Sequence, residues 1–179
     1  MVRVKELMTG LSEIPIVDEN ATLFEAVLEI GLARTKMSAG MRSPAALVVD
    51  GGKRVSGFLE FKNMLMGLDA GFEELIQSAR QSGLSPDRVR SELQKSGLLQ
   101  DALDGLCQKA GETSIKSVMT IPGQDRTTDG DVSISEAAYR MVESGQDYLL
   151  VLEGNVVEGI ISLSDVMGYI CDTVRACRL

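Results

Sequence analysis

The chain contains two copies of one sequence pattern, and this repeat constrains the fold more than any other feature. The order of the matched blocks is the same in both copies, although the spacing between blocks differs. The matches pair residues 4–9 with 115–120, 18–26 with 129–137, 47–50 with 150–153, and 57–63 with 159–165. Ordered similarity over separate blocks indicates two structural units of the same kind.

Each copy predicts a leading segment, a strand, a helix, a strand, a tight turn, a strand and a second helix. Thr22 and Ser133 each precede a glutamate by three residues, which is the pattern of a capping box at a helix N-terminus. An apolar helical face follows each box, formed by Ala26, Val27 and Ile30 in the first copy and by Ala137, Met141 and Val142 in the second. One copy has too few strands to bury a sheet face, so we expect a mixed α/β fold (α+β) in which two halves pack sheet to sheet.

The end of the second copy carries a candidate binding site. Residues 148–153 and 156–161 are rich in Val, Ile and Leu, and a Gly154-Asn155 turn joins them into a hairpin. The second run leads into Ser162, which with Asp165 forms a capping pair. The same pair suits a nucleotide, because a helix N-terminus favours a phosphate and a carboxylate accepts hydrogen bonds from ribose hydroxyls. Both interpretations stay open on the sequence alone.

Composition argues against several classes of function. A net charge of -8 argues against a nucleic-acid partner, and the sequence lacks both an apolar run long enough to span a membrane and a signal-peptide pattern. The three cysteines are odd in number and lack a Cys-x-x-Cys spacing, which indicates ordinary thiols in a reducing compartment and favours a cytoplasmic location. The chain contains no histidine, the usual general base and metal ligand. We therefore expect no catalytic residues, no metal site and no enzymatic activity.

The twin Val/Ile-x-x-Val/Leu-Met-Thr segments, the capped helices, the Val-Val-Asp hairpin and the Gly-Ile-Ile-Ser-x-x-Asp ending resemble a tandem pair of cystathionine-β-synthase (CBS) domains, called a Bateman module. The resemblance implies CBS repeats at residues 1–68 and 112–179, packed as a pseudo-twofold pair, with an all-helical insert at residues 69–111. It also implies a regulatory module that binds adenosine compounds, including AMP, ADP, ATP or S-adenosylmethionine, and that associates as a homodimer.

The resemblance also assigns site residues. It implies that Ser162 and Asp165 hold phosphate and ribose, while Gly159 and Ile160 line the cleft of the second repeat. Tyr148, which stands with Asp147 where polyphosphate-binding relatives carry basic side chains, is either a flank for the base or an ordinary sheet residue. We therefore expect a monophosphate or an adenosyl compound rather than ATP.

The first repeat departs from this pattern. Glu60 and Asn63 stand where the second repeat has Ser162 and Asp165. Asn63 can still bond a ribose, but Glu60 places a negative charge where a phosphate would lie. Two unit charges about 4 Å apart repel by about 4 kcal/mol at an effective dielectric constant near 20. We expect the first cleft to be empty or to take a neutral ligand.

Two insertions distinguish the chain. Residues 34–43 predict a surface loop or a basic flap over a cleft. Residues 69–111 predict three short helices whose acidic and basic residues balance, which argues against a DNA-binding helix-turn-helix and favours a subdomain that covers the module or builds an oligomer contact. Because no effector domain is visible, the output would pass to a separate effector protein. The alternative is a structural or oligomerisation protein with a vestigial cleft.

Overall fold

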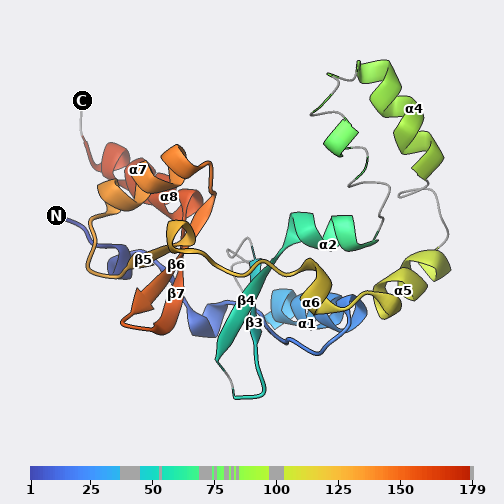
Figure 1. The fold of residues 1–179 in the computed structure, drawn as a ribbon. Coiled ribbons are helices and arrows are strands. Elements are labelled where there is room, and N and C mark those ends of the chain that lie inside the picture. Colours follow the sequence, from blue (N-terminus) through green and yellow to red (C-terminus); the bar gives the residue numbers. More distant parts are fainter. Residues whose placement is uncertain are drawn as a thin grey trace.

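Two sheets, one of four strands and one of three, form the centre of the molecule (Figure 1). The computed structural model describes residues 1–36, 45–52, 54–68, 74, 76–78, 81, 83, 85–96 and 103–177. Its elements are η1 (Val4–Glu6), β1 (Thr9–Gly10), η2 (Leu11–Glu13), β2 (Ile16–Asp18), α1 (Leu23–Lys36), β3 (Ala45–Val49), β4 (Val55–Glu60), α2 (Phe61–Leu68), α4 (Pro86–Ser96), α5 (Leu103–Glu112), α6 (Ile115–Val118), η3 (Gln124–Arg126), β5 (Thr127–Asp129), α7 (Ile134–Ser144), β6 (Tyr148–Glu153), β7 (Val156–Ser162) and α8 (Leu163–Ala176).

The two halves repeat the same strand pairing. In the first half β2 runs parallel to β3, and β3 pairs with β4 as an antiparallel hairpin. In the second half β5, β6 and β7 pair in the same way. Both hairpins shift register at the same place, between Val48 and Val49 in the first and between Val151 and Leu152 in the second. These features confirm the mixed α+β fold built from two similar halves.

The central strands β3 and β6 are buried on both faces because the sheets pack against each other on one face and against helices on the other. In β3, Ala45 and Leu47 contribute to the core between the sheets, while Ala46 and Val48 pack toward α1 and α2. This alternation follows from the two-residue period of a strand. The core between the sheets consists of Ile14, Ala45, Leu47, Phe58, Tyr148, Leu150 and Ile160.

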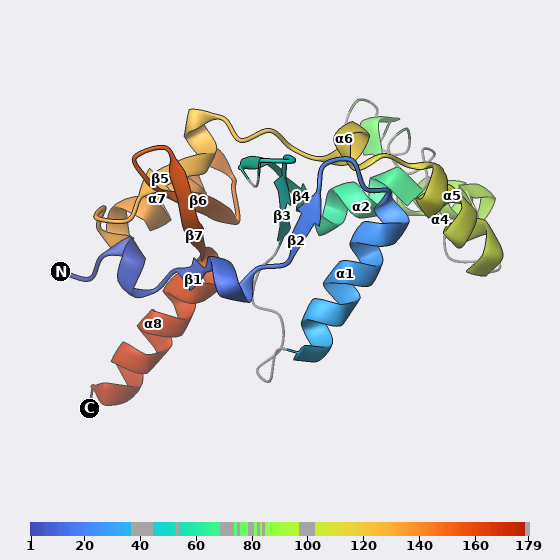
Figure 2. The same ribbon diagram turned by 90° about the horizontal axis from the view of Figure 1, so that it is seen from below.

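The leading segment of each copy packs on the opposite half. The N-terminal segment, residues 2–10, places β1 beside β7 (Figure 2), where Thr9 and Gly10 lie opposite Ile160 and Gly159. The backbone N–H of Val4 also donates to the carbonyl of Val132, at 3.0 Å. These contacts join the start of the chain to its second half.

The second leading segment, residues 113–120, crosses in the other direction. The backbone N–H of Leu23 donates to the carbonyl of Thr113 at 2.8 Å, and the backbones of Phe58 and Thr120 exchange two hydrogen bonds of 2.9 and 3.0 Å. At the crossing points the backbones approach so closely that a Cβ on Gly57 would meet the Thr120 carbonyl oxygen. Glycine stands at the matching position 159 for the same reason, since a Cβ there would meet the carbonyl of Thr9.

The helix caps follow the sequence. Thr22 and Ser133 accept hydrogen bonds from the backbone N–H of Glu25 and Glu136, at 3.3 and 3.2 Å. The predicted apolar faces are correct only in part. Val27 is 41% exposed and Val142 is 72% exposed, so these two residues face away from the core that buries their neighbours.

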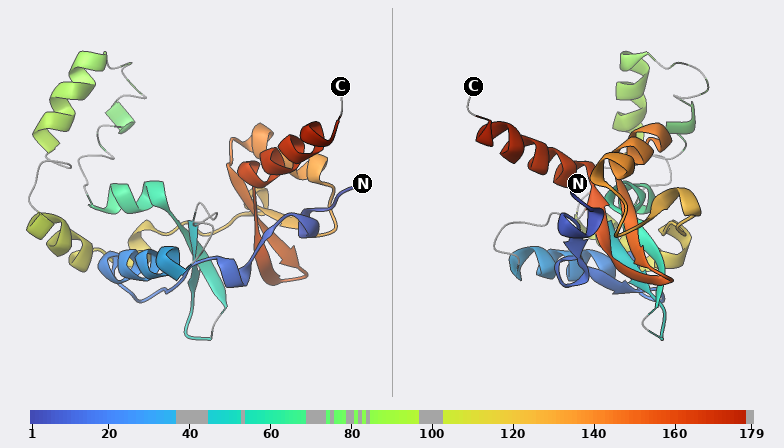
Figure 3. Two further views of the ribbon diagram at one scale, coloured as in Figure 1. Left: turned by 180° about the vertical axis from the view of Figure 1, so that it is seen from behind. Right: turned by 90° about the vertical axis from the view of Figure 1, so that its left-hand side faces the viewer.

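Of the described helices of the insert, α5 packs against α1 and α2 of the first half, whereas α4 stands away from both sheets (Figures 1 and 3). Helix α4 begins at Pro86, as its Ser-Pro-Asp start predicts, and the backbone N–H of Arg88 donates to the Ser85 hydroxyl at 3.4 Å. Residues 34–36 belong to α1 and not to the predicted loop. Residues 37–43 and most of the first predicted helix of the insert lie outside the described residues.

Candidate functional site

The junction of β7 and α8 brings together four of the six predicted ligand-binding residues. Ser162 is the N-cap of α8, and its hydroxyl accepts a hydrogen bond from the backbone N–H of Asp165 at 3.2 Å. Oδ2 of Asp165 accepts in return from the Ser162 backbone N–H at 2.9 Å and from its hydroxyl at 2.6 Å. The capping pair predicted from the sequence is therefore complete, and helix α8 presents its N-terminus at this point.

Gly159 and Ile160 lie on β7 just before this cap, where β1 pairs with them as the neighbouring antiparallel strand. Ile160 is buried in the core between the sheets, opposite Thr9. The Thr9 side chain is also buried and comes from the other end of the chain. This places residues from the N-terminal segment next to the β7–α8 junction, which the sequence repeat did not indicate.

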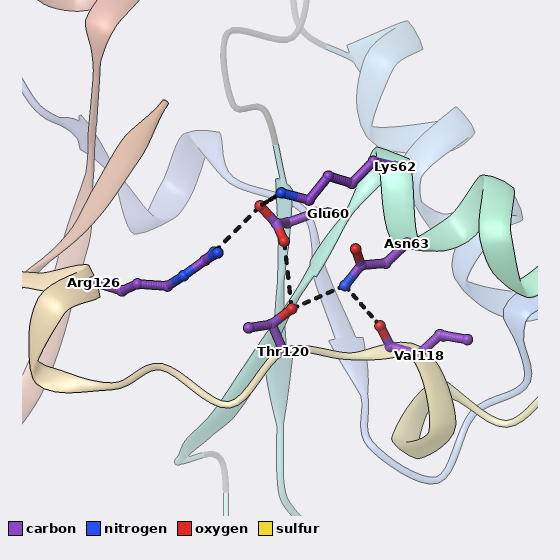
Figure 4. A network of polar contacts seen from close by, with 6 residues as sticks. All are labelled: Glu60, Lys62, Asn63, Val118, Thr120 and Arg126. Atoms are coloured by element: carbon purple, nitrogen blue, oxygen red, sulfur yellow. Dashed lines mark hydrogen bonds and ion pairs between the residues drawn. The ribbon is translucent and has the colours of Figure 1, made fainter. Parts of the chain in front are cut away.

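The matching junction of the first half contains a polar network instead (Figure 4). Oε1 of Glu60 contacts Nζ of Lys62 at 3.0 Å and Nη1 of Arg126 at 3.3 Å, while Oε2 accepts from the Thr120 hydroxyl at 3.4 Å. The side-chain amide of Asn63 donates to Oγ1 of Thr120 and to the carbonyl of Val118, both at 2.9 Å. We call Glu60, Lys62, Asn63, Thr120, Arg126 and the nearby Tyr148 the Glu60 cluster.

The Glu60 cluster joins the two halves. Glu60 and Asn63 belong to the first half, whereas Arg126 lies immediately before β5 of the second half. Glu60 is only 6% exposed, so its charge is paired at a largely dry position. Arg126 also stacks over the Phe58 ring, with its guanidinium carbon 5.2 Å from the ring centroid.

The Tyr148 backbone on β6 lies opposite Ser162, next to the β7–α8 junction, but its side chain packs in the Glu60 cluster. It is 4% exposed, and its ring meets Phe58 edge to face with centroids 5.5 Å apart. Among the described residues its buried hydroxyl has no well-formed hydrogen bond. The sheet role predicted as one alternative is thus observed, and any contact of Tyr148 with a base stays a prediction.

The charges of the cluster shift the pKa values of two of its members. Burial raises the pKa of Glu60, but the hydrogen bond and charge of Lys62 and the charge of Arg126 outweigh burial, so its pKa lies below the ordinary value. Burial, followed by the negative charge of Glu60, raises the pKa of Tyr148 well above that of a free tyrosine. Glu60 is therefore an anion and Tyr148 is neutral at physiological pH.

The structure therefore divides the six predicted residues between two places. Gly159, Ile160, Ser162 and Asp165 lie at the second junction, while the side chains of Asn63 and Tyr148 belong to the Glu60 cluster. Thr120 and Arg126 are members of the cluster that the sequence did not predict. When the two copies are aligned, Arg126 matches Pro15, so the second copy has a cation where the first has none. That difference is the sequence signal for Arg126.

Two classes of feature are absent from the part of the chain that the structure describes. No cluster of His, Cys, Asp or Glu there is suited to hold a metal ion. No helix within the same residues combines the length and the apolar character needed to cross a membrane.

Comparison with known proteins places the fold. Residues 115–172 match the family described as CBS domain, and no curated protein matches the chain. The chain is similar to the crystal structure of CBSX2 in complex with AMP, with a TM-score of 0.60 and 16% identity over 98% of this chain and 100% of that chain.

Two further solved structures have the same fold. The CBS-pair protein CBSX2 from Arabidopsis thaliana has a TM-score of 0.60 and 15% identity, over 98% of each chain. A putative acetoin utilization protein (AcuB) from Vibrio cholerae has a TM-score of 0.56 and 18% identity, over 98% of this chain and 94% of that chain. At these identities the similarity establishes the fold alone.

Proposed function

Because the chain is a tandem CBS domain pair, a Bateman module, we propose that it is a non-catalytic sensor that binds an adenosine-type ligand in the second repeat. The ligand class is an AMP-like nucleotide or an adenosyl compound such as S-adenosylmethionine. The crystal structure of CBSX2, a protein of the same fold, in complex with AMP supports this ligand class. A tandem CBS pair is a regulatory module, and we propose its ligand and its mode of signalling.

The geometry of the β7–α8 junction carries the proposal. Helix α8 directs its positive N-terminal end toward the place where Ser162 and Asp165 lie, which favours an anionic group. The bonds between these residues use Oδ2 of Asp165, so Oδ1 is the oxygen that we expect to accept from the ribose hydroxyls. A phosphate would take the hydroxyl of Ser162 away from Asp165, which exchanges one charge-assisted hydrogen bond for another.

The size and charge of the surrounding residues limit the ligand. The positions that match Arg126 and Tyr148 of the Glu60 cluster in the other copy of the repeat hold Pro15 and Ala45, which are small and uncharged. Small residues leave more room for a nucleoside, and the missing cation leaves less compensation for a polyphosphate. The proposal therefore favours a ligand with one phosphate or none over ATP.

Thermal unfolding with AMP, ADP, ATP, NAD and S-adenosylmethionine tests the proposal. A compound at about 100 times its dissociation constant adds about 2.7 kcal/mol of stability. Asp165→Asn should abolish the gain for the compound that shifts the wild type. Asp172→Asn is the matched control, since Asp172 is an exposed residue of the same helix and is far less buried than Asp165.

A structural or oligomerisation role is the second candidate. The observation that favours it is the complete capping box, because capping alone accounts for both Ser162 and Asp165. If none of the five compounds raises the unfolding temperature of the wild type, this second candidate is preferred.

We further propose that the working form is a homodimer joined through the outer helices. Apolar side chains are exposed along both helix pairs: Phe24, Val27, Leu28 and Leu32 on α1, Phe61 and Leu65 on α2, Tyr139 and Val142 on α7, and Met167, Ile170 and Val174 on α8. A groove of roughly 370 Å³ lies between α1 and α2. A second copy is the natural occupant, because it brings the same apolar helix pairs and an isologous interface needs self-complementary faces.

Sedimentation of the wild type and of Leu28→Glu tests the dimer. The wild type should sediment as a dimer and the variant as a folded monomer, because a buried unpaired charge opposes association. Glu29→Lys, a charge change on the exposed part of the same helix, is the control and should remain dimeric. A wild type that is monomeric at all concentrations would contradict the proposal.

Signalling would then depend on how the ligand affects the arrangement of the halves. A ligand shifts a conformational equilibrium only by its difference in affinity for the two states. Residues from the N-terminal segment and from the second half meet at the proposed site, so a ligand there has the contacts to change their relative position. We propose that a separate effector protein detects this change.

A further inference from the structure

The Glu60 cluster has the composition of an anion-binding site. An ammonium group, a guanidinium group and a hydroxyl group converge on one carboxylate that is 6% exposed. Figure 4 shows the three donors arriving from different directions: Lys62 from α2, Thr120 from the segment that crosses to the first half, and Arg126 from the second half. Such a set of donors suits any small carboxylate of the right size.

The donors are held in place by contacts other than Glu60. The guanidinium of Arg126 lies over the Phe58 ring. The backbone of Thr120 exchanges two hydrogen bonds with Phe58, and its hydroxyl oxygen accepts from the amide of Asn63. Only Lys62, whose side chain is 63% exposed, depends mainly on Glu60 for its position. The site is therefore preorganised, and we expect it to persist when the carboxylate is removed.

The second junction has neither this carboxylate nor its two cations. The positions that match Glu60, Lys62 and Arg126 hold Ser162, Ser164 and Pro15. The Glu60 carboxylate and the two cations are thus features of the first junction alone and are matched to each other. Without the carboxylate, both cations would lack a counter-charge at the first junction.

We propose that this cluster is a carboxylate-binding site whose occupant is the chain's own Glu60 side chain. Glu60 fills the donor set from within and excludes external anions from the first half. A small carboxylate ligand binds there when, and only when, the Glu60 carboxylate is absent. This inference does not depend on adenosine binding in the second half.

Chemical rescue tests this inference. Glu60→Ala removes one methylene and one carboxylate group, the atoms that acetate supplies. The full-length variant should unfold at a lower temperature than the wild type in sodium chloride. Replacing chloride by acetate at equal ionic strength should raise the unfolding temperature of the variant by about 3 °C or more. In a chain of this size, such a shift means that acetate recovers a large share of the stabilisation that one ion pair provides. The wild type should show no such difference between the two salts.

Two controls separate the site from a general salt effect. The double variant Glu60→Ala with Arg126→Met lacks the main buried donor, so acetate should not stabilise it more than chloride does. Pivalate, which is too bulky for the space left by Glu60, should not rescue Glu60→Ala. Equal acetate effects on the wild type, the single variant and the double variant would overturn the inference.

A second variant covers the case in which Glu60→Ala does not fold. Glu60→Ser introduces the residue that caps the matching helix in the second half, and it should therefore support the start of α2. The same comparison of acetate with chloride applies to it. A folded Glu60→Ser variant without an acetate-dependent gain in unfolding temperature would also overturn the inference.

Discussion

The two junctions between a sheet and its last helix are built on the same plan and filled in different ways. In the first half, Glu60 is paired with Lys62 and Arg126. In the second half, Ser162 and Asp165 satisfy each other and the helix start. The difference shows that a duplicated fold can keep its strand pairing while a few side chains give the two junctions different polar contacts.

The largest effect should come from substituting the glycines at which the leading segments cross, Gly159 and Gly57, which occupy matching positions in the two halves. Gly159→Ala places a Cβ against the Thr9 carbonyl oxygen, so β1 must move away from β7. We expect a loss of about 3 kcal/mol in the free energy of unfolding, measured with urea. Gly57→Ala should cost less, because its Cβ would lie 2.9 Å from the Thr120 carbonyl oxygen, a less severe contact.

Gly168 provides the control for these substitutions. It lies within α8 and has open space around its Cβ position. Gly168→Ala should stabilise the protein by about 0.5–1 kcal/mol through helix propensity. Equal small effects at positions 57, 159 and 168 would contradict the crossed packing of the leading segments.

The second largest effect should come from breaking the ion pairs of the Glu60 cluster, which occur at the first junction. Arg126→Met leaves the buried Glu60 with Lys62 and the Thr120 hydroxyl as its partners in the cluster, and we expect a loss of about 2 kcal/mol, less than for a fully unpaired buried charge. Lys62→Met should cost about 0.5 kcal/mol or less, because Lys62 is largely exposed. Urea unfolding at neutral pH compares the two, and equal costs would show that Arg126 does not tie the halves together.

Acid should weaken this contribution. The native pKa of Glu60 is lowered below its ordinary value of 4.5, so its ion pairs stabilise the protein above that pH. As the pH falls through the lower native pKa, Glu60 takes up a proton and the stabilisation is lost. The difference in unfolding free energy between the wild type and Arg126→Met should therefore shrink below about pH 4.5. A difference that stays constant between pH 7 and pH 3 would contradict this account of the ion pair.

The smallest effect should come from the tyrosine hydroxyl. Tyr148→Phe removes a buried oxygen without a well-formed hydrogen bond among the described residues, so we expect a change within about 0.5 kcal/mol at neutral pH. The raised native pKa of Tyr148 means that the unfolded chain loses its proton first, near pH 10, which lowers stability as the pH rises further. The variant should lack this part of the alkaline loss, as followed by urea unfolding between pH 8 and 11.

Local features of this fold could be predicted from the sequence because they depend on neighbouring residues. The Gly154 turn has the expected positive φ, and Ser133 and Ser162 cap the helices that follow them. The repeat predicted two similar halves, and the strand pairings confirm it. Each of these signals lies within a few residues of the structure that it specifies.

The crossed leading segments and the Glu60 cluster could not be predicted in this way. Because the halves are alike, residues 2–10 satisfy the same local rules on either sheet, and only the tertiary arrangement selects the second. The partnership of Glu60 with Arg126 depends on that crossing as well. The exposure of Val27 and Val142 likewise depends on which side of each helix faces its sheet. In both helices apolar residues continue from the buried side onto the exposed side, so the sequence does not show where the buried side ends.

The number of ligands bound per chain tests the central contrast between the two halves most directly. Isothermal titration with the compound that gives the largest thermal shift should show one site per chain, lost in Asp165→Asn and retained in Asn63→Asp. Two equivalent sites per chain, or a single site that survives Asp165→Asn, would contradict an account in which Glu60 closes the first junction and the second is the one that binds.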